Sequence, residues 1–186
     1  QIRAYLRSKT DREILKGLEP GMTGMTGSPA ILRDGYVIPE SGYKVIETGE
    51  YNKVPLIIGT NKDETKLFLN FSRSFSWRSE MYQAVGRYGS DLWKVSGADS
   101  VAEVLMANVD QPPVYVYQFT WGSPNASGES PLPGNRGMKL GAFHTLEVPF
   151  FLGTDTINGR VLAPFFFTRR NEEGRKSLSN VMMSYV

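Results

Sequence analysis

Two short apolar runs in the chain have the length and composition of β-strands. Residues 54–59 (VPLIIG) form a continuous apolar stretch that ends in the polar sequence TNKDE, residues 60–64. Residues 114–121 (VYVYQFTW) are dense in β-branched and aromatic side chains and follow two prolines. Continuous apolar runs are typical of strands buried in a parallel sheet. We therefore predict two core strands, the first followed by a polar loop.

Helices are predicted in three further regions. Thr10 and Glu13 fit a capping box, with apolar residues following at helical spacing. Residues 65–108 are predicted to be mostly helical, and residues 172–185 give an amphipathic pattern that runs on to the end of the chain. Within the second region Asp99 and Ser100 are expected to start a helix. Its inner face would carry Val101, Val104, Leu105 and Asn108.

Glycine and proline mark the connections between these elements. Residues 21–28 and 123–137 predict loops, and Asp34 with Gly35 predicts a turn. The resulting order of strand, helices, strand, loop and helix favours an α/β fold with a parallel sheet, as one domain over residues 1–186. In such sheets functional groups gather where strands end. Glu64 and His144 each follow a predicted strand and can therefore converge on one edge.

Composition excludes several classes of function. The chain has 186 residues, a formal net charge of +2 and no cysteine, so disulfides and a cysteine nucleophile are excluded. Basic and acidic residues alternate, which predicts no nucleic-acid groove. No stretch approaches the roughly 20 apolar residues of a membrane span. No signal peptide is recognised at the start, and composition leaves the cellular compartment open.

Glu64 and its neighbour Asp63 have two interpretations at this stage. Polar groups after a strand commonly form a solvated turn or a helix N-terminus, where the helix dipole favours carboxylates. Alternatively, Glu64 is a buried carboxylate that orients a histidine and stabilises its imidazolium form. Residue types alone leave both interpretations open.

His144 is the only histidine, so any chemistry that requires an imidazole must use it. It lies in the sequence GAFHTLE, residues 141–147, before an apolar segment. A single histidine is more often a surface or core residue than a functional one. His144 and Glu147 also read H-x-x-E, but two ligands without a second histidine make a poor metal site. We therefore expect no metal and no cofactor.

A serine nucleophile in an α/β-hydrolase lies in G-x-S-x-G, at a sharp turn from strand to helix. No serine in this chain has glycine two positions before and two positions after it. Ser130 comes nearest, but Pro131 follows it and lacks the N–H that would serve an oxyanion hole. We predict that Ser130 is a loop residue and that the chain contains no nucleophile.

Two longer motifs carry a family resemblance. The run VPLIIGTNKDETKLF (residues 54–68) resembles the segment around the triad acid of type B carboxylesterases and cholinesterases. GAFHTLEVPFFLG (residues 141–153) resembles that family's segment around the catalytic histidine. LRSK, DGYVIP and LSNVMMSY agree as well, in the family's order, so the resemblance covers nearly the whole chain. Bacterial members of the para-nitrobenzyl esterase kind are the most similar.

The resemblance implies a Ser-His-Glu triad that hydrolyses a small-molecule carboxylic ester. Glu64 would be the acid and His144 the general base, with Glu147 and Asp63 in supporting roles. The order of Glu64 before His144 fits the α/β-hydrolase order of nucleophile, acid and base. One departure is Thr145, because the family commonly has glycine after the histidine.

The resemblance also implies that the chain is a C-terminal part of a longer domain. The family's domain is several hundred residues long, so we expect the N-terminal half with the nucleophile elbow, and the extreme C-terminus, to be missing. Such a piece should be inactive alone, and should pair with the missing half or self-associate. The natural substrate is not indicated. Aromatic residues after Glu64 either line its pocket or belong to the core: Phe68, Phe71, Phe75 and Trp77.

Two other functions compete with ester hydrolysis. The family includes cell-adhesion proteins on the same fold that have lost the triad, although Glu64 and His144 are both retained here. The motif matches would instead be accidental if the chain were an unrelated α/β binding or structural domain.

Overall fold

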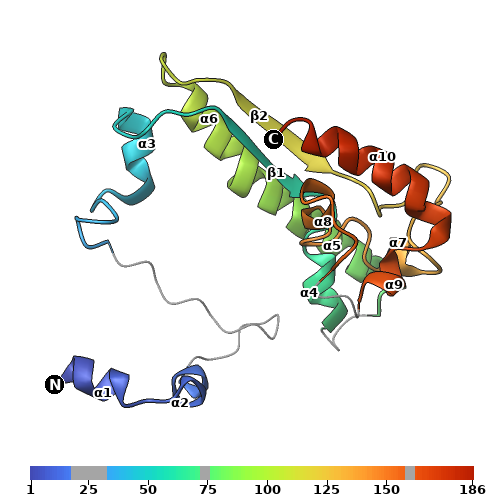
Figure 1. The fold of residues 1–186 in the computed structure, drawn as a ribbon, viewed down its shortest axis with the longest axis horizontal. Coiled ribbons are helices and arrows are strands. Elements are labelled where there is room, and N and C mark those ends of the chain that lie inside the picture. The colour runs from blue at the N-terminus through green and yellow to red at the C-terminus, as the bar shows by residue number, and fades with distance from the viewer. Residues whose placement is uncertain (18–32, 72–75, 158–161) are drawn as a thin grey trace.

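The two predicted strands pair with each other in parallel. The computed structural model describes residues 1–17, 33–71, 76–157 and 162–186. Within them β1 (Leu56–Asn61) and β2 (Val114–Phe119) form a two-stranded sheet, with Leu56 opposite Val114 and Asn61 opposite Phe119. Helices join and cover the strands (Figure 1). The α/β class is therefore confirmed, whereas the wider hydrolase architecture stays a prediction.

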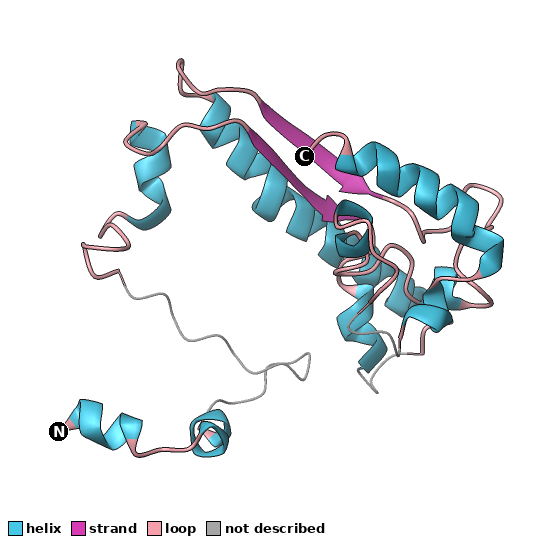
Figure 2. Ribbon diagram, in the orientation of Figure 1, coloured by secondary structure: helices cyan, strands magenta, loops and turns pink. Residues whose placement is uncertain are grey.

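Helices pack on both faces of this small sheet. One face carries α5 (Glu80–Lys94), the π-helical turn η2 (Val95–Asp99) and α6 (Ser100–Met106). The opposite face meets α8 (Val148–Phe151), which packs in turn on α10 (Glu172–Met183). Figure 2 shows the strands between these helices. The arrangement gives three layers, with the strand ends pointing toward one group of loops.

The remaining elements are short. They are α1 (Ile2–Arg7), α2 (Asp11–Lys16), η1 (Gly42–Lys44), α3 (Val45–Thr48), α4 (Lys66–Phe71), α7 (Arg136–Lys139), α9 (Ala163–Phe166) and η3 (Arg169–Asn171). The capping box of α2 is confirmed, because Thr10 and Glu13 hydrogen-bond reciprocally. The turn at Asp34 is confirmed as well, since its Oδ1 accepts three successive backbone N–H groups. The loop expected at residues 21–28 lies outside the described residues.

The structure corrects the helix start expected at Asp99. The chain is already helical there, because α5 continues through η2 into α6 without a break. Asp99 has helical dihedral angles and caps nothing, and its carboxylate pairs with Lys94 at 2.6 Å. The expected inner face is only partly right, since Ala102 and Leu105 are the buried residues of α6. The terminal helix α10 ends at Met183 and does not continue to Val186.

The strands are less buried than their apolar sequences predict. Tyr115 is 62% exposed, Val116 43% and Ile57 40%. Covering helices contact only part of each face, so the early residues of both strands lie open. Burial increases toward the strand ends, where Thr60, Asn61 and Phe119 are buried.

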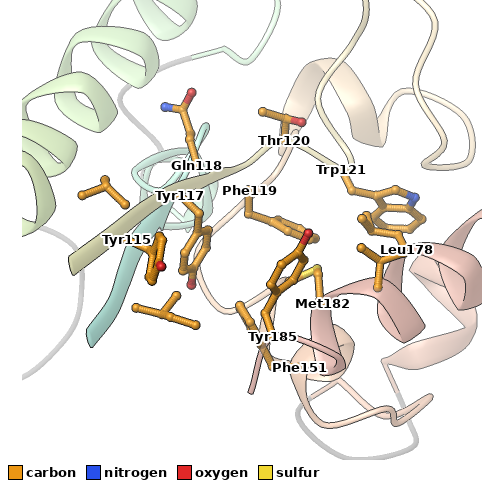
Figure 3. A pocket seen from close by; sticks show the side chains of 13 residues that line it. Tyr115, Tyr117, Gln118, Phe119, Thr120, Trp121, Phe151, Leu178, Met182 and Tyr185 are labelled. Carbon is orange, nitrogen blue, oxygen red and sulfur yellow. The ribbon is translucent and has the colours of Figure 1, made fainter. Parts of the chain in front are cut away.

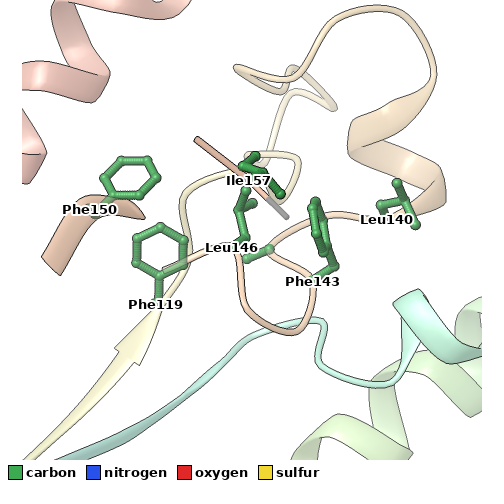
Figure 4. Close-up of a cluster of buried hydrophobic side chains, with 7 residues drawn as sticks. Phe119, Leu140, Phe143, Leu146, Phe150 and Ile157 are labelled. Carbon is green, nitrogen blue, oxygen red and sulfur yellow. The ribbon is translucent and has the colours of Figure 1, made fainter. Parts of the chain in front are cut away.

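The hydrophobic core begins at the last residue of β2, Phe119, and extends beyond the strand. It is built around the segment that carries His144 and consists of Phe119, Leu140, Ala142, Phe143, Leu146, Phe150 and Ile157 (Figure 4). Phe119 and Phe150 meet edge to face, with ring centroids 4.9 Å apart. Because Phe143 and Leu146 point into this core, the intervening residues 144–145 are held at its surface.

Asp63 joins the loops that follow the two strands. Its N–H donates to the carbonyl of Ala142 at 3.0 Å, and its Oδ2 accepts the N–H of Ala142 at 3.0 Å. The same oxygen accepts from the Ser123 hydroxyl. Its other oxygen, Oδ1, lies 2.9 Å from Lys66 Nζ, and both side chains are buried. These bonds fix the segment of His144 against the end of β1.

Gly141 offers a stability test of this junction. Its φ is +58°, and a Cβ there would overlap the Asp63 carboxylate. Gly128 has a similar positive φ of +82° but open space around the Cβ position. We expect Gly141→Ala to lower the free energy of unfolding by roughly 3 kcal/mol or more, from backbone and steric strain together. Gly128→Ala should cost about 1 kcal/mol, from the backbone alone. Equal losses in denaturant unfolding would contradict the steric role of Asp63.

Candidate active site

Glu64 and His144, far apart in sequence, are in direct contact. Glu64 lies in the turn that follows β1, and the carboxylate Oε2 is 2.6 Å from His144 Nδ1. The other oxygen, Oε1, accepts the backbone N–H of Asn61 at 2.7 Å. Glu64 is only 5% exposed, so both of its oxygens are used and its orientation is fixed. The structure thus brings together the two residues that the sequence singled out.

The protonation of the imidazole follows from this contact. An ionised carboxylate can only accept hydrogen bonds, so Nδ1 carries the proton and donates it to Glu64. In the neutral ring Nε2 then bears the lone pair, which is the arrangement a general base requires. Among the described residues, none forms a hydrogen bond with Nε2, and the histidine side chain is 36% exposed.

Two aromatic rings pack against the imidazole. The ring centroids of Phe68 and Trp93 lie 5.3 and 5.2 Å from that of His144. The two rings also stack on each other, 5.9 Å apart and nearly parallel. They come from α4 and α5, two helices that contact each other, so both helices support the histidine. Trp93 was not expected from the sequence at this position, because its place on α5 relative to His144 depends on the helix packing.

The electrostatic environment favours the protonated histidine. The hydrogen bond with Glu64 is the largest cause that raises the pKa of His144 above its ordinary value of 6.5, and the charges of Glu64 and Glu147 act in the same direction. Burial opposes this effect. Burial and the negative charges of Glu147 and Glu64 also raise the pKa of Tyr117 to about 12, so its phenol stays neutral.

Asn61 holds the surroundings of the pair together. Its side-chain Nδ2 donates to the Phe143 carbonyl at 2.8 Å and also to Glu147 Oε2. Asn61 is 1% exposed, so this amide fixes both flanks of His144 from within the protein. Sequence reasoning noted Asn61 only as part of a polar group. The available signal was an amide in the last position of an apolar strand, where a buried partner is required.

Thr145 has a left-handed backbone, with a φ of +73°. It is the only residue other than glycine with a positive φ in the described ranges. β-Branched residues rarely adopt this conformation, which glycine adopts freely. Threonine at this position therefore introduces backbone strain next to the imidazole.

Other candidates from the sequence lie elsewhere. The Ser130 hydroxyl donates to the Gly122 carbonyl at 2.7 Å and accepts the Leu132 N–H, so it stabilises a loop. No serine of the described segments hydrogen-bonds with His144. Phe71 is 70% exposed and Phe75 lies outside the described residues, while Trp77 is half-buried and packs under Arg78.

The described residues also bear on metal binding and membrane insertion. No group of three potential metal ligands occurs in residues 1–17, 33–71, 76–157 or 162–186. No helix within those ranges is long and apolar enough to cross a membrane.

The histidine titration can be measured directly, because the chain has one histidine. We expect the NMR-derived pKa of His144 to lie above 6.5 and to fall in Glu64→Gln, which removes the charge but keeps the shape. The raised folded-state pKa means that the associated stability is fully present below the pKa of the unfolded histidine. This stability is lost as pH rises through the folded-state pKa. An unchanged pKa in Glu64→Gln would contradict the contact.

Replacing Thr145 tests the backbone strain. Thr145→Gly should raise the free energy of unfolding by about 1 kcal/mol, because the left-handed conformation is unfavourable for an L-residue. Thr145→Ala is the control, since it removes the branched side chain but keeps the penalty of a Cβ. Denaturant unfolding of both variants gives the comparison. If alanine stabilises as much as glycine, the side chain and not the backbone is the source of strain.

Comparison with known proteins gave no match. No protein-family model, no curated protein and no solved structure matches this chain.

Proposed function

We propose that these residues belong to a carboxylic ester hydrolase in which Glu64 and His144 are two members of a Ser-His-Glu triad. The nucleophilic serine would come from polypeptide outside residues 1–186. The observation that carries the proposal is the 2.6 Å contact between Glu64 Oε2 and His144 Nδ1. It fixes the imidazole with its basic nitrogen directed away from the acid.

The chemistry assigns each group a role. His144 Nε2 removes the proton of the serine hydroxyl as the serine oxygen attacks the ester carbonyl. The resulting imidazolium is stabilised by Glu64, which holds it through Nδ1–H. The C–O bond to the alcohol then breaks, and the imidazolium gives its proton to the departing alkoxide. Water hydrolyses the acyl-enzyme through the same proton transfers.

The environment of the pair supports this assignment. Glu64 is buried and accepts two hydrogen bonds, so it reorganises little when the imidazole becomes charged. Phe68 and Trp93 restrict rotation of the ring. The hydrogen bond between Asn61 and Glu147 supports the segment that carries His144. These features are what a positioned general base requires.

Labelling with a fluorophosphonate probe tests the proposal. The probe is applied to the longest natural polypeptide that contains residues 1–186, and mass spectrometry locates the modified residue. We expect one labelled serine outside these residues. His144→Ala should lower the rate of ester hydrolysis by about 10³- to 10⁴-fold, because the base that activates the serine is lost.

Two further variants separate the role of Glu64 from the effect of any charge change. Glu64→Gln should lower kcat strongly with little change in KM, whereas Glu173→Gln, an exposed charge change on α10, should leave both unchanged. Folded protein that is neither labelled nor active would contradict the proposal. It would favour a non-catalytic adhesion or binding protein that retains Glu64 and His144.

The 186-residue chain alone provides a separate test. We expect no ester hydrolysis above buffer, because the chain has no G-x-S-x-G motif and no described serine hydrogen-bonds with His144. Serine-dependent turnover by this chain alone would contradict an external nucleophile.

A further inference from the structure

Trp93 contacts the imidazole of His144 from the end of a long helix. The two ring centroids are 5.2 Å apart, with an angle of 37° between the ring planes. This distance lies within the range of about 6 Å over which a cation interacts with an aromatic ring. The indole is 37% exposed, and Phe68 stacks on it with the ring centroids 5.9 Å apart. Trp93 therefore presents an aromatic surface to a ring that becomes charged when it binds a proton.

A π-helical turn follows Trp93 almost directly. Helix α5 ends at Lys94, and the chain continues as η2 (Val95–Asp99). Single π-helical turns are rare in proteins and are frequent at functional sites. Ala98 of η2 is fully buried, and η2 packs on β1, the strand that leads to Glu64. The turn thus fixes the end of α5 relative to the strand that positions the acid.

Two contacts tie this turn to itself and to the indole. Lys94 Nζ lies 2.6 Å from both carboxylate oxygens of Asp99, a residue five positions later. The hydrogen bonds of a π-helix join residues at this spacing, so the ion pair follows the geometry of the turn. Gly97 borders the indole, since a Cβ there would lie 3.4 Å from Trp93 Cδ1, in van der Waals contact. The indole is therefore in contact with η2 as well as with Phe68 and His144.

The charges around the imidazole favour its protonated form. Glu64 binds it through Nδ1, and Glu147 adds a second negative charge nearby. The two lysines closest in sequence to the aromatic rings are already paired with acids, which neutralises their charge: Lys66 with Asp63, and Lys94 with Asp99. The indole is thus the contact through which α5 acts on the histidine.

We propose that Trp93 is a positioning residue for His144, which holds the imidazole against Glu64 and stabilises its protonated form through the π system of the indole. The π-helical turn η2 sets the indole in place for this role. A cation is attracted by the electron-rich face of an aromatic ring. The catalytic part of this inference rests on the proposed ester hydrolysis, in which an imidazolium forms whenever the serine is activated.

A purely covering role for Trp93 would have the opposite electrostatic effect. Burial lowers the pKa of His144, because it disfavours the charged form. Removing a residue that only buries the ring would therefore raise this pKa. Removing a residue that stabilises the imidazolium would lower it. The direction of the change in pKa thus separates the two roles.

Histidine titration by NMR tests the proposal. The protein is the longest natural polypeptide that contains residues 1–186, and the signal of His144 is assigned by its loss in His144→Gln. We expect Trp93→Leu, which keeps an apolar cover, to lower the pKa of His144 by about half a unit. Trp93→Phe keeps an aromatic ring and should retain most of the original pKa. Trp77→Leu is the control, because Trp77 packs against Arg78, and it should leave the pKa unchanged.

The turn is tested by a separate variant. Asp99→Asn breaks the ion pair across η2 and should lower the pKa of His144 by less than Trp93→Leu does. Circular dichroism checks that all variants are folded. A pKa that rises or stays constant in Trp93→Leu would overturn the proposal, as would an equal fall in Trp93→Phe. An unchanged pKa in Asp99→Asn would overturn the role of the turn.

Ester hydrolysis by the same polypeptide gives a second readout. Trp93→Leu should lower kcat roughly tenfold with little change in KM, because the base is less well positioned. The acidic limb of the pH profile of kcat/KM should move to lower pH, together with the pKa of His144. An active enzyme whose kcat and pH profile are unchanged in Trp93→Leu would overturn the positioning role. A natural polypeptide without ester hydrolysis would contradict the proposed function instead, and the titration would still decide what Trp93 does to the histidine.

Discussion

The site depends on the bonds between Asp63 and the backbone of Ala142. They join the loop after β1 to the loop that carries His144, two segments that the sequence separates by 79 residues. Asp63 is buried. Its Oδ2 accepts the Ala142 N–H and its Oδ1 pairs with Lys66, so the negative charge of the buried carboxylate is neutralised. Gly141 makes this close approach feasible because a side chain there would occupy the position of the carboxylate. Without this junction, the contact between Glu64 and His144 would have no fixed geometry.

The acid–histidine pair uses groups that the junction has already placed. Asn61 ends β1, and its backbone N–H and side-chain amide contact Glu64, Glu147 and the Phe143 carbonyl. Hydrogen bonding to Glu64 raises the pKa of His144, while the rings of Phe68 and Trp93 pack against the imidazole. Thr145 adopts an unfavourable backbone in the same turn. Strain of this kind persists only where surrounding contacts determine the conformation.

The structure is organised unevenly around its small sheet. The strand ends are buried and carry the site, whereas early residues of both strands, such as Ile57 and Tyr115, are exposed. Apolar residues that a larger sheet would cover are therefore exposed on β2 and α10, where they line one groove (Figure 3).

From the sequence alone, two strands in a parallel sheet were predicted, and Glu64 and His144 were singled out as residues that could meet at one edge. Apolar runs and turn residues are local signals, and the long motifs drew attention to Glu64 and His144 before any geometry was known. Sequence could not place Trp93 or Asn61 at the site, because their partners lie in segments brought together only by packing. The continuous helix through Asp99 was missed for a related reason, since a carboxylate that caps a helix and one that pairs with Lys94 look alike in sequence. Exposure of the strands was likewise decided by tertiary structure, because an apolar pattern records a need for burial and not whether a neighbour is present to provide it.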